Sequence, residues 1–476
     1  MPDASPIAET TRSSLQRMLS PRSIAIVGAS SDPVRIGGRP LARLISEGFP
    51  GPIYPVNPAR ETVQGVAAIK SVLDLPEGVD CAIVVVAAEQ AVQAIRDCVT
   101  RKVGSVVLMS AGFAEAGERG VALQNELSAI ARSSGMRIVG PNCMGLFNVA
   151  AKAHLSFASW VPPAVSPTFN LAVVSQSGGY GTHVLRLCQR REIVVSHWLT
   201  TGNECDVNAG ELVGAVAELP EVNAIFVYLE GLRSADALIA GLEKAHARRV
   251  PVVVIKSGSS EVGAAAAASH TASLAGADQV YDAVFRSYGV FRAESTEEAM
   301  DVVYALSRRI LPADSRTCVF TLSGGVGVQI ADFMAEAGVP LEELSASAQE
   351  TIKGMVPQAG TRNPVDITAQ FMNDLSVVEA SLDLVMGREK FNVVLSFLSA
   401  VGLVPHLVPP IAAAYGEMNR RYPGRLNVIA MIGTPEVVKM MEDAGCLVFE
   451  EARRAVRALA ALHGFARAFA RPLPSR

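Results

Sequence analysis

One histidine of the chain stands among unusually small residues. His270 follows five consecutive alanines in EVGAAAAASHTASLAGADQVYDAVF, residues 261–285. Alanine fills little volume, so this run suits a packed core poorly and better suits a loop that moves or that a large partner approaches. An imidazole can act as a nucleophile or as an acid–base group near neutral pH. His270 is therefore a candidate for chemistry, with a satisfied core or surface histidine as the alternative.

A carboxylate that could serve this histidine ends an almost wholly apolar run. Glu230 lies in VYLEG, residues 227–231. If Glu230 lies opposite His270, its carboxylate would hold one imidazole nitrogen and leave the other free to attack. The alternative is a carboxylate that caps the helix after the strand.

Turns of small residues that could bind anions recur along the chain. VVSQSGGYG, residues 173–181, places a serine and two glycines where a helix is expected to begin, so free amides and the helix dipole would favour a phosphate. TLSGGVG, residues 321–327, repeats this chemistry. IAIVGASSDPVRIGG, residues 24–38, could hold a phosphate in the same way, although a glycine turn without a ligand is the alternative there.

Several other chemistries find no support in the sequence. The first turn lacks the G-x-G-x-x-G pattern after Gly28, and the next strand ends in YPVNP where an NAD-binding site needs Asp or Glu. There is no G-x-S-x-G elbow, no H-E-x-x-H and no carboxylate cluster for a metal. His154 and His197 lack a glycine-rich setting, and His183 falls inside an expected helix.

These residues must be positioned by parallel sheets. Short β-branched runs alternate with longer alanine-rich segments, a pattern typical of strands covered by helices. We expect three doubly wound α/β domains, in which ligands bind beyond the carboxyl ends of the strands. Residues 154–170, rich in proline, are expected to form a linker. The expected strands and their following turns are 23–30, 51–58, 81–87, 105–112 and 137–142; then 171–179, 194–203, 224–231 and 250–258; then 317–327, 363–368, 392–400, 427–433 and 446–451.

Composition sets the class of protein. The 476 residues are 50% apolar and 18% charged, with a net charge of −4 and no basic footprint for nucleic acid. The N-terminus has no apolar signal region, and no run of about 18 apolar residues predicts a membrane span. Seven cysteines without a C-x-x-C pair favour reduced thiols. We expect a soluble cytoplasmic protein that binds neither nucleic acid nor membrane.

The motifs together resemble those of a known superfamily. IVGAS, YPVNP, SAGFAE, GPNCMGLFN, VSQSGGYG, TGNE, YLEG and ASHTASLAG occur in this order, as in the NDP-forming acyl-CoA synthetases, which include succinyl-CoA synthetase. SGGVGVQIADFMAEAGVPLEELS and PQAGTRNPVDIT resemble the extra flavodoxin-like domain of the ADP-forming acetate–CoA ligase type. The resemblance implies a Rossmann-like CoA-binding domain (1–150), a flavodoxin-like domain with the phosphohistidine loop (168–310) and a second flavodoxin-like ligase domain (315–465).

The resemblance also implies a mechanism. Acyl-CoA and phosphate interconvert with acyl phosphate and CoA, and the phosphoryl group then passes to a histidine, matched by His270 and steadied by Glu230. In the family this histidine rides on a mobile loop, matched here by residues 263–276. The expected phosphate and acyl-phosphate residues are Gln176, Ser177, Gly178, Gly179, Asn142 and Cys143, the last not as a nucleophile. The expected CoA residues are Gly28, Ala29, Ser30, Ser31, Asn57, Pro58, Arg60, Ser110, Ala111 and Gly112, and no resident metal is expected.

The sequence departs from the family pattern at three points. Ala272 replaces the glycine after S-H-T, and Ala87 replaces a proline that is usual in the family at the expected CoA-binding part. No ATP-grasp domain is found, so the chain resembles an α subunit. A separate ATP-grasp β subunit is therefore expected to supply ATP/ADP and Mg²⁺, in a hetero-oligomer or with the chain as a homodimer.

Two alternatives stay open beside a ligase acting on a small carboxylic acid or its CoA thioester. One is a CoA-binding regulatory protein that keeps the fold without complete catalysis. The other is a stand-alone acyl-CoA:phosphate acyltransferase or thioesterase-like enzyme. Nothing in the sequence selects the acyl group or ADP over GDP.

Overall fold

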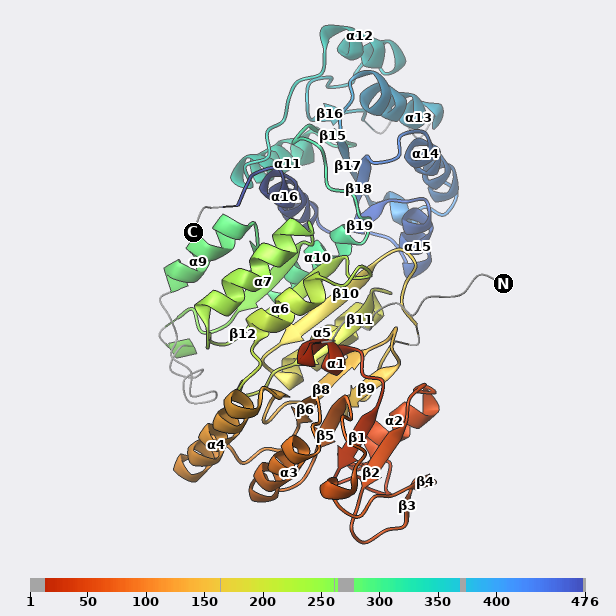
Figure 1. Ribbon diagram of the computed structural model, residues 1–476. Coiled ribbons are helices and arrows are strands. Elements are labelled where there is room, and N and C mark those ends of the chain that lie inside the picture. The colour runs from red at the N-terminus through yellow and green to blue at the C-terminus, as the bar shows by residue number, and fades with distance from the viewer. Residues whose placement is uncertain (1–12, 163, 261, 264–277, 369–373, 474–476) are drawn as a thin grey trace, which may run out of the picture. The chain divides into compact units, whose positions relative to one another are not determined.

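The chain divides into two compact units in a computed structural model. The structure describes residues 13–162, 164–260, 262–263, 278–368 and 374–473, so His270 lies outside the described residues (Figure 1). One unit is Met1–Tyr288 and the other Gly289–Arg476. The first contains a parallel sheet and a mixed sheet, and the second contains one parallel sheet.

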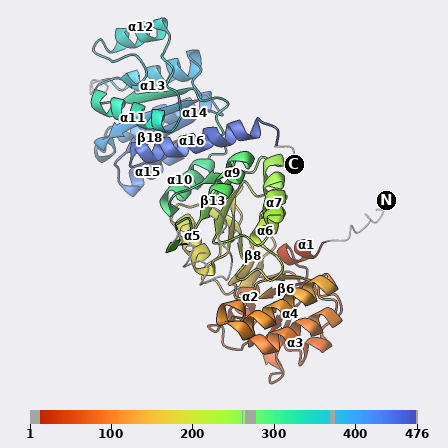
Figure 2. The ribbon, with the colours of Figure 1, turned by 90° about the vertical axis from the view of Figure 1, so that its left-hand side faces the viewer.

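The first sheet is fully parallel, in the order β2-β1-β5-β6-β7. Its inner strands are buried on both faces, as expected for a sheet covered by helices. Helices α3 and α4 lie side by side on one face (Figure 1 and Figure 2). The order of strands reverses between β1 and β5, where such sheets bind ligands. The strands are β1 Ile24–Val27, β2 Ile53–Val56, β5 Cys81–Val84, β6 Ser105–Leu108 and β7 Arg137–Val139, with a hairpin of β3 Thr62–Val63 and β4 Val66–Ala67. The helices are α1 Ser14–Leu19, α2 Arg39–Ser46, α3 Ala88–Thr100 and α4 Glu118–Ser134.

Six strands of the second sheet lie in this unit, in the order β13-β12-β10-β11-β8-β9. Strands β10 to β13 are parallel, and the order reverses between β10 and β12. Strand β8 pairs with β11 and with β9, both in antiparallel fashion. The strands are β8 Gly145–Asn148, β9 Ala153–Ser156, β10 Asn170–Ser175, β11 Val194–Thr200, β12 Ala224–Leu229 and β13 Val252–Lys256. The helices are α5 Gly178–Arg190, α6 Ala209–Ala217, α7 Ala235–Ala247 and α9 Asp278–Tyr288.

The prediction of a linker over residues 154–170 was wrong at its start. Strand β9 occupies residues up to Ser156, and strand β8 before it was not predicted at all. Both strands are buried but carry glycine, asparagine, histidine and serine instead of a β-branched run. Strand β8 pairs with β11, more than forty residues later, and β9 pairs in turn with β8, so local propensity gave no signal for either strand.

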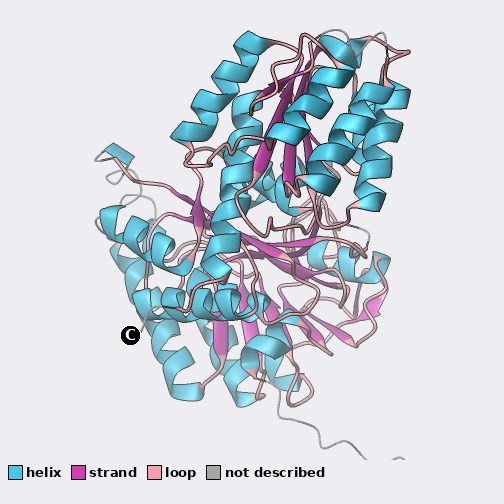
Figure 3. Cartoon of the chain, turned by 90° about the horizontal axis from the view of Figure 1, so that it is seen from above, coloured by secondary structure: helices cyan, strands magenta, loops and turns pink. Residues whose placement is uncertain are grey.

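The second unit contains a parallel sheet in the order β16-β15-β17-β18-β19. In chain order this is 2-1-3-4-5, the flavodoxin-like arrangement. Helices flank the sheets of the chain (Figure 3). The side chain of Asp301 on α10 forms a bidentate ion pair with Arg454 on α16, with both distances 2.7 Å. The strands are β14 Phe291–Arg292, β15 Thr317–Thr321, β16 Val365–Asp366, β17 Val393–Ser399, β18 Leu426–Met431 and β19 Leu447–Phe449. The helices are α10 Thr296–Leu306, α11 Gly324–Glu336, α12 Ala346–Met355, α13 Ser376–Asp383, α14 Val408–Arg421, α15 Pro435–Asp443 and α16 Ala452–Phe469.

The predicted α/β class with parallel sheets is confirmed. The boundaries 1–150, 168–310 and 315–465 stay a prediction. Among the described residues, no helix is both long and apolar enough to cross a membrane.

Candidate functional site

A cleft of about 610 Å³ lies in the first unit, at the carboxyl ends of the strands of both sheets. It brings together nine of the residues predicted for the site: Ser110, Ala111, Asn142, Cys143, Gln176, Ser177, Gly178, Gly179 and Glu230. It is also lined by Ile36, Val85, Val86, Met109, Met144, Phe157, Gly202 and Asn203. The other CoA candidates, Gly28, Ala29, Ser30, Ser31, Asn57, Pro58, Arg60 and Gly112, do not line it.

The amino end of helix α5 forms one wall of the cleft. Ser177 is the N-cap, and its hydroxyl accepts a hydrogen bond from the amide of Tyr180 at 3.3 Å. The amides of Gly178 and Gly179 lie in the first turn of α5. Backbone N–H groups there have no carbonyl partner within the helix. A side chain at position 178 would collide with Met144, while position 179 is open. This wall can therefore receive an anion on backbone amides.

Gln176 and Glu230 meet where the order of the second sheet reverses. Oε1 of Gln176 accepts hydrogen bonds from the amides of Glu230 (2.5 Å) and Gly231 (3.1 Å). Its Nε2 donates to the carbonyl of Gly231 at 2.9 Å. The side chain of Gln176 thus supports the backbone that carries the Glu230 carboxylate into the cleft.

Asn142 and Cys143 form the turn after strand β7. Asn142 has a φ of 58°, a left-handed conformation that places its side chain in the cleft. Cys143 is buried, and this burial raises the pKa of its thiol to about 12. The thiol is therefore protonated at neutral pH and a poor nucleophile.

The first turn of the first sheet is built from close backbone contacts. Gly28 has a φ of 87°, and a Cβ there would lie 2.6 Å from the carbonyl oxygen of Val85. Nδ2 of Asn57 donates to the carbonyl of Ala29 at 2.9 Å. Arg60 is exposed. Asn57 therefore shapes this turn, and Arg60 is accessible to a ligand.

The turn at the start of α11 in the second unit repeats the local arrangement. Thr321 donates its hydroxyl to the carbonyl of Ser323 at 2.8 Å, as Ser175 does to Ser177 at 2.6 Å. The carboxylate of Asp366 lies 3.1 Å from where a Cβ of residue 324 would be. The carboxylate of Asp366 thus lies beside this turn, where its negative charge would repel an anion.

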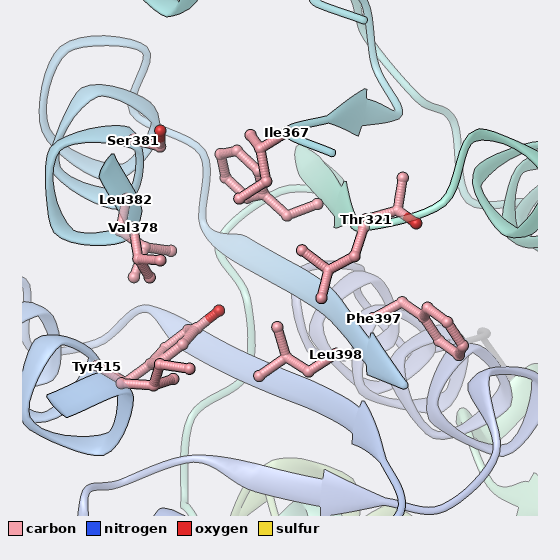
Figure 4. A pocket seen from close by; sticks show the side chains of 11 residues that line it. Thr321, Ile367, Val378, Ser381, Leu382, Phe397, Leu398 and Tyr415 are labelled. Atoms are coloured by element: carbon pink, nitrogen blue, oxygen red, sulfur yellow. The ribbon is translucent and has the colours of Figure 1, made fainter. Parts of the chain in front are cut away.

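A second, much smaller cavity lies in the core of the second unit and has about 20 Å³ of space, enough for about one water molecule. In Figure 4, Leu398, Val378 and Thr321 surround it, and Tyr415 reaches toward it. The hydroxyl of Tyr415 donates to Ser396 at 2.7 Å. No lining residue is charged, and the space is too small for a substrate larger than a water molecule. In the described part of the chain, no group of His, Cys, Asp and Glu side chains could hold a metal ion.

Two further residues of the cleft region were missed by sequence reasoning. Glu115 and Asn203 are hydrogen-bonded to each other, Nδ2 to Oε2, at 2.5 Å. Both lie in motifs that carried the resemblance, SAGFAE and TGNE, but no role was assigned to them. The motifs were the available signal.

Comparison with known proteins agrees with this geometry. Residues 22–148 match the family "CoA binding domain", and residues 169–306 match "Succinyl-CoA ligase like flavodoxin domain". The chain is 33% identical to the α subunit of acetate–CoA ligase [ADP-forming] I from Pyrococcus furiosus, over 94% of this chain and 97% of the relative. It is 32% identical to acetate–CoA ligase [ADP-forming] I of Archaeoglobus fulgidus, over 94% of this chain and 63% of that longer protein.

A solved structure is similar over nearly the whole chain. It is that of Ca. Korarchaeum cryptofilum dinucleotide forming acetyl-coenzyme A synthetase 1 in complex with phosphate and ADP. The TM-score is 0.85 at 32% identity, and the match covers 96% of this chain and 97% of that one. The match thus includes the second unit, beyond the two family domains. This chain belongs to the family of ADP-forming acyl-CoA ligases.

Proposed function

We propose that this chain is the α-subunit part of an ADP-forming acid–CoA ligase. The overall reaction interconverts acyl-CoA, phosphate and ADP with a carboxylic acid, CoA and ATP. One observation carries the proposal: a single cleft gathers the turn at Ser110, the Asn142 amide, the amino end of α5 and Glu230. A CoA thioester, a phosphate and a histidine are the groups that these residues suit.

In the first step, an oxygen of phosphate attacks the thioester carbonyl. The carbon–sulfur bond breaks, the proton of hydrogen phosphate passes to the sulfur, acyl phosphate forms and CoA leaves as the thiol. The amides of Gly178 and Gly179, at the positive end of α5, hold the phosphate oxygens. The side-chain amide of Asn142 donates to the carbonyl oxygen as negative charge develops on it. The turn at Ser110, Ala111 and Gly112 receives CoA.

In the second step, the imidazole of His270 attacks phosphorus. The bond between phosphorus and the acyl oxygen breaks, releasing the carboxylate and leaving a phosphohistidine. Glu230 holds the other imidazole nitrogen so that the attacking nitrogen keeps its lone pair. His270 is assigned from its motif.

We also propose that ADP receives the phosphoryl group on a separate ATP-grasp β subunit, which provides the Mg²⁺. The relative from Pyrococcus furiosus is named an α subunit, and the longer one from Archaeoglobus fulgidus leaves room for further domains in one chain. A hetero-oligomer follows from this proposal. All seven cysteines are free and buried, which supports a reducing, cytoplasmic location.

The test is a mass measurement on the intact chain after incubation with acyl phosphate. The wild type should gain one acid-labile HPO₃ group, His270→Ala should gain none, and the exposed His406→Ala should behave as wild type. Conversion of acyl phosphate and CoA to acyl-CoA without phosphorylation would contradict the phosphohistidine and favour a stand-alone acyltransferase. CoA binding without turnover would favour a regulatory protein.

A further inference from the structure

A buried asparagine connects the two sheets across the floor of the cleft. Asn203, in the loop after β11, is 7% exposed. Its Nδ2 donates to Oε2 of Glu115 at 2.5 Å and to Oε1 of Gln124 at 3.0 Å. Its Oδ1 accepts from Nδ2 of Asn142 at 3.3 Å. Both hydrogens of the amide are therefore committed, and this fixes which way its oxygen points.

Glu115 extends the connection to the CoA turn. Its Oε1 accepts hydrogen bonds from the amides of Gly112 (2.6 Å) and Phe113 (3.2 Å). Burial opposes ionisation of Glu115, but the hydrogen bonds from Asn203, Gly112 and Phe113 outweigh it and lower the pKa of the carboxyl group. The carboxylate therefore stays charged and holds the end of the 110–112 turn.

The backbones on either side also touch. Gly202 has a φ of 59°, and a Cβ there would lie 2.2 Å from the carbonyl oxygen of Pro141. The amide of Asn203 donates to this same carbonyl at 2.9 Å, and the amide of Asn142 donates to the carbonyl of Ser110 at 2.9 Å. The loop after β11, the turn after β7 and the CoA turn are thus held as one body.

From these contacts we propose that Asn203 is a positioning residue for acyl transfer. Its oxygen takes one N–H of Asn142 and thereby orients the other N–H toward the thioester carbonyl. Its N–H groups tie this orientation to Glu115, and so to the turn that receives CoA. The proposal rests on the proposed function, because it assigns Asn142 a partner in that reaction. Asn203 itself touches no reacting atom.

The experiment uses the full chain and the reaction of acetyl phosphate with CoA. The rate is measured from the amount of thioester formed over time. Asn203→Asp keeps the shape, removes both donors and places a carboxylate beside Glu115. We expect kcat to fall roughly 100-fold, which is the loss that follows when a positioned group is displaced by about 1 Å. The change in KM for CoA should be smaller. Asn208→Asp is the matched control, because Asn208 lies in the same loop and contacts Glu211, but not Asn142. Its kcat should stay within about twofold of wild type.

A double variant tests positioning against simple damage. Glu115→Gln combined with Asn203→Asp reverses the donor and acceptor, so Gln at 115 can donate to Asp at 203. We expect kcat to recover at least about tenfold over Asn203→Asp alone, a coupling that double-mutant cycles detect. A similar kcat in the double variant and in Asn203→Asp alone would overturn the inference. A kcat of Asn203→Asp equal to that of Asn208→Asp would overturn it too.

Two outcomes separate this inference from the proposed function. A wild type that makes no acyl-CoA from acetyl phosphate or from other acyl phosphates overturns the proposed function, and the inference with it. A wild type that is active, with a Glu115→Gln variant of unchanged kcat, overturns the inference alone. This second arm holds even if Asn203→Asp fails to fold, because Glu115→Gln disturbs the same hydrogen bond from its other end.

Discussion

Replacing Gly202 by alanine tests how closely the two halves of the cleft must approach. The left-handed φ of 59° costs an alanine about 1–2 kcal/mol. The added Cβ would lie 2.2 Å from the carbonyl oxygen of Pro141 and 2.6 Å from that of Asn142. Carbon–oxygen contacts are ordinarily about 3.3 Å or longer, so the backbone must move by about 1 Å.

This displacement sets the expected magnitude. A shift of about 1 Å at a positioning element costs about 100-fold in rate, which corresponds to about 2.7 kcal/mol in activation free energy. The strain should also lower the free energy of unfolding by roughly 2–4 kcal/mol. Both effects should occur together in Gly202→Ala, because the same close approach of the backbones causes the displacement and much of the strain.

The assay measures acyl transfer from acetyl phosphate to CoA and the thermal midpoint of unfolding on the same samples. Gly464→Ala is the control, since Gly464 lies inside helix α16 with open space around it. Alanine there should leave the rate unchanged and, if anything, stabilise the helix by up to about 1 kcal/mol. A Gly202→Ala variant with wild-type rate and wild-type midpoint would refute the close approach.

Two further predictions concern stability. Burial lowers the pKa of His154, His197 and His463 to about 4, from an ordinary value of 6.5. Between about pH 6.5 and pH 4, these histidines are therefore protonated in the unfolded chain but neutral in the folded chain. The free energy of unfolding should fall as the pH falls through this window, by up to roughly 3 kcal/mol per histidine. Urea unfolding at pH 7 and pH 5 measures this, and equal midpoints would contradict it. Asp301→Ala removes the bidentate partner of Arg454 in the second unit but leaves its ion pair with Glu297, so it should cost roughly 2 kcal/mol, seen as a lower urea midpoint. A change below about 0.5 kcal/mol would show that the Asp301–Arg454 pair is dispensable.

The sequence was sufficient for the parallel architecture and for much of the cleft. Strands such as Ala224–Leu229 are continuous apolar runs, and each ends in a turn of small residues, so both the strand and its functional end are local signals. The walls of the cleft at Ser177 and at Glu230 were predicted for this reason. The geometry of their meeting, through Gln176, came only from the structure.

The rest depends on contacts between distant residues. Asn203 meets Glu115 and Asn142 across 88 and 61 positions of sequence, and no spacing rule relates such residues. Gly202 is an ordinary turn residue by sequence, while the structure shows that it is required by the carbonyl of Pro141. Hydrogen-bond partners across two sheets are a property of packing, which a single sequence does not encode in any local pattern.

The antiparallel strand β8 links the folding of the CoA-binding part to that of the flavodoxin-like part. It begins directly after the Asn142 turn of the first sheet, yet its hydrogen bonds go to β11 of the second. A fragment that starts after Ser156 would leave the edge of β11 unpaired beside Trp198, which is buried in the full chain. Such an edge can pair with other chains and cause aggregation. We therefore expect the two sheets to melt in one transition. Exchange of either part between relatives, in the laboratory or in evolution, would have to carry both.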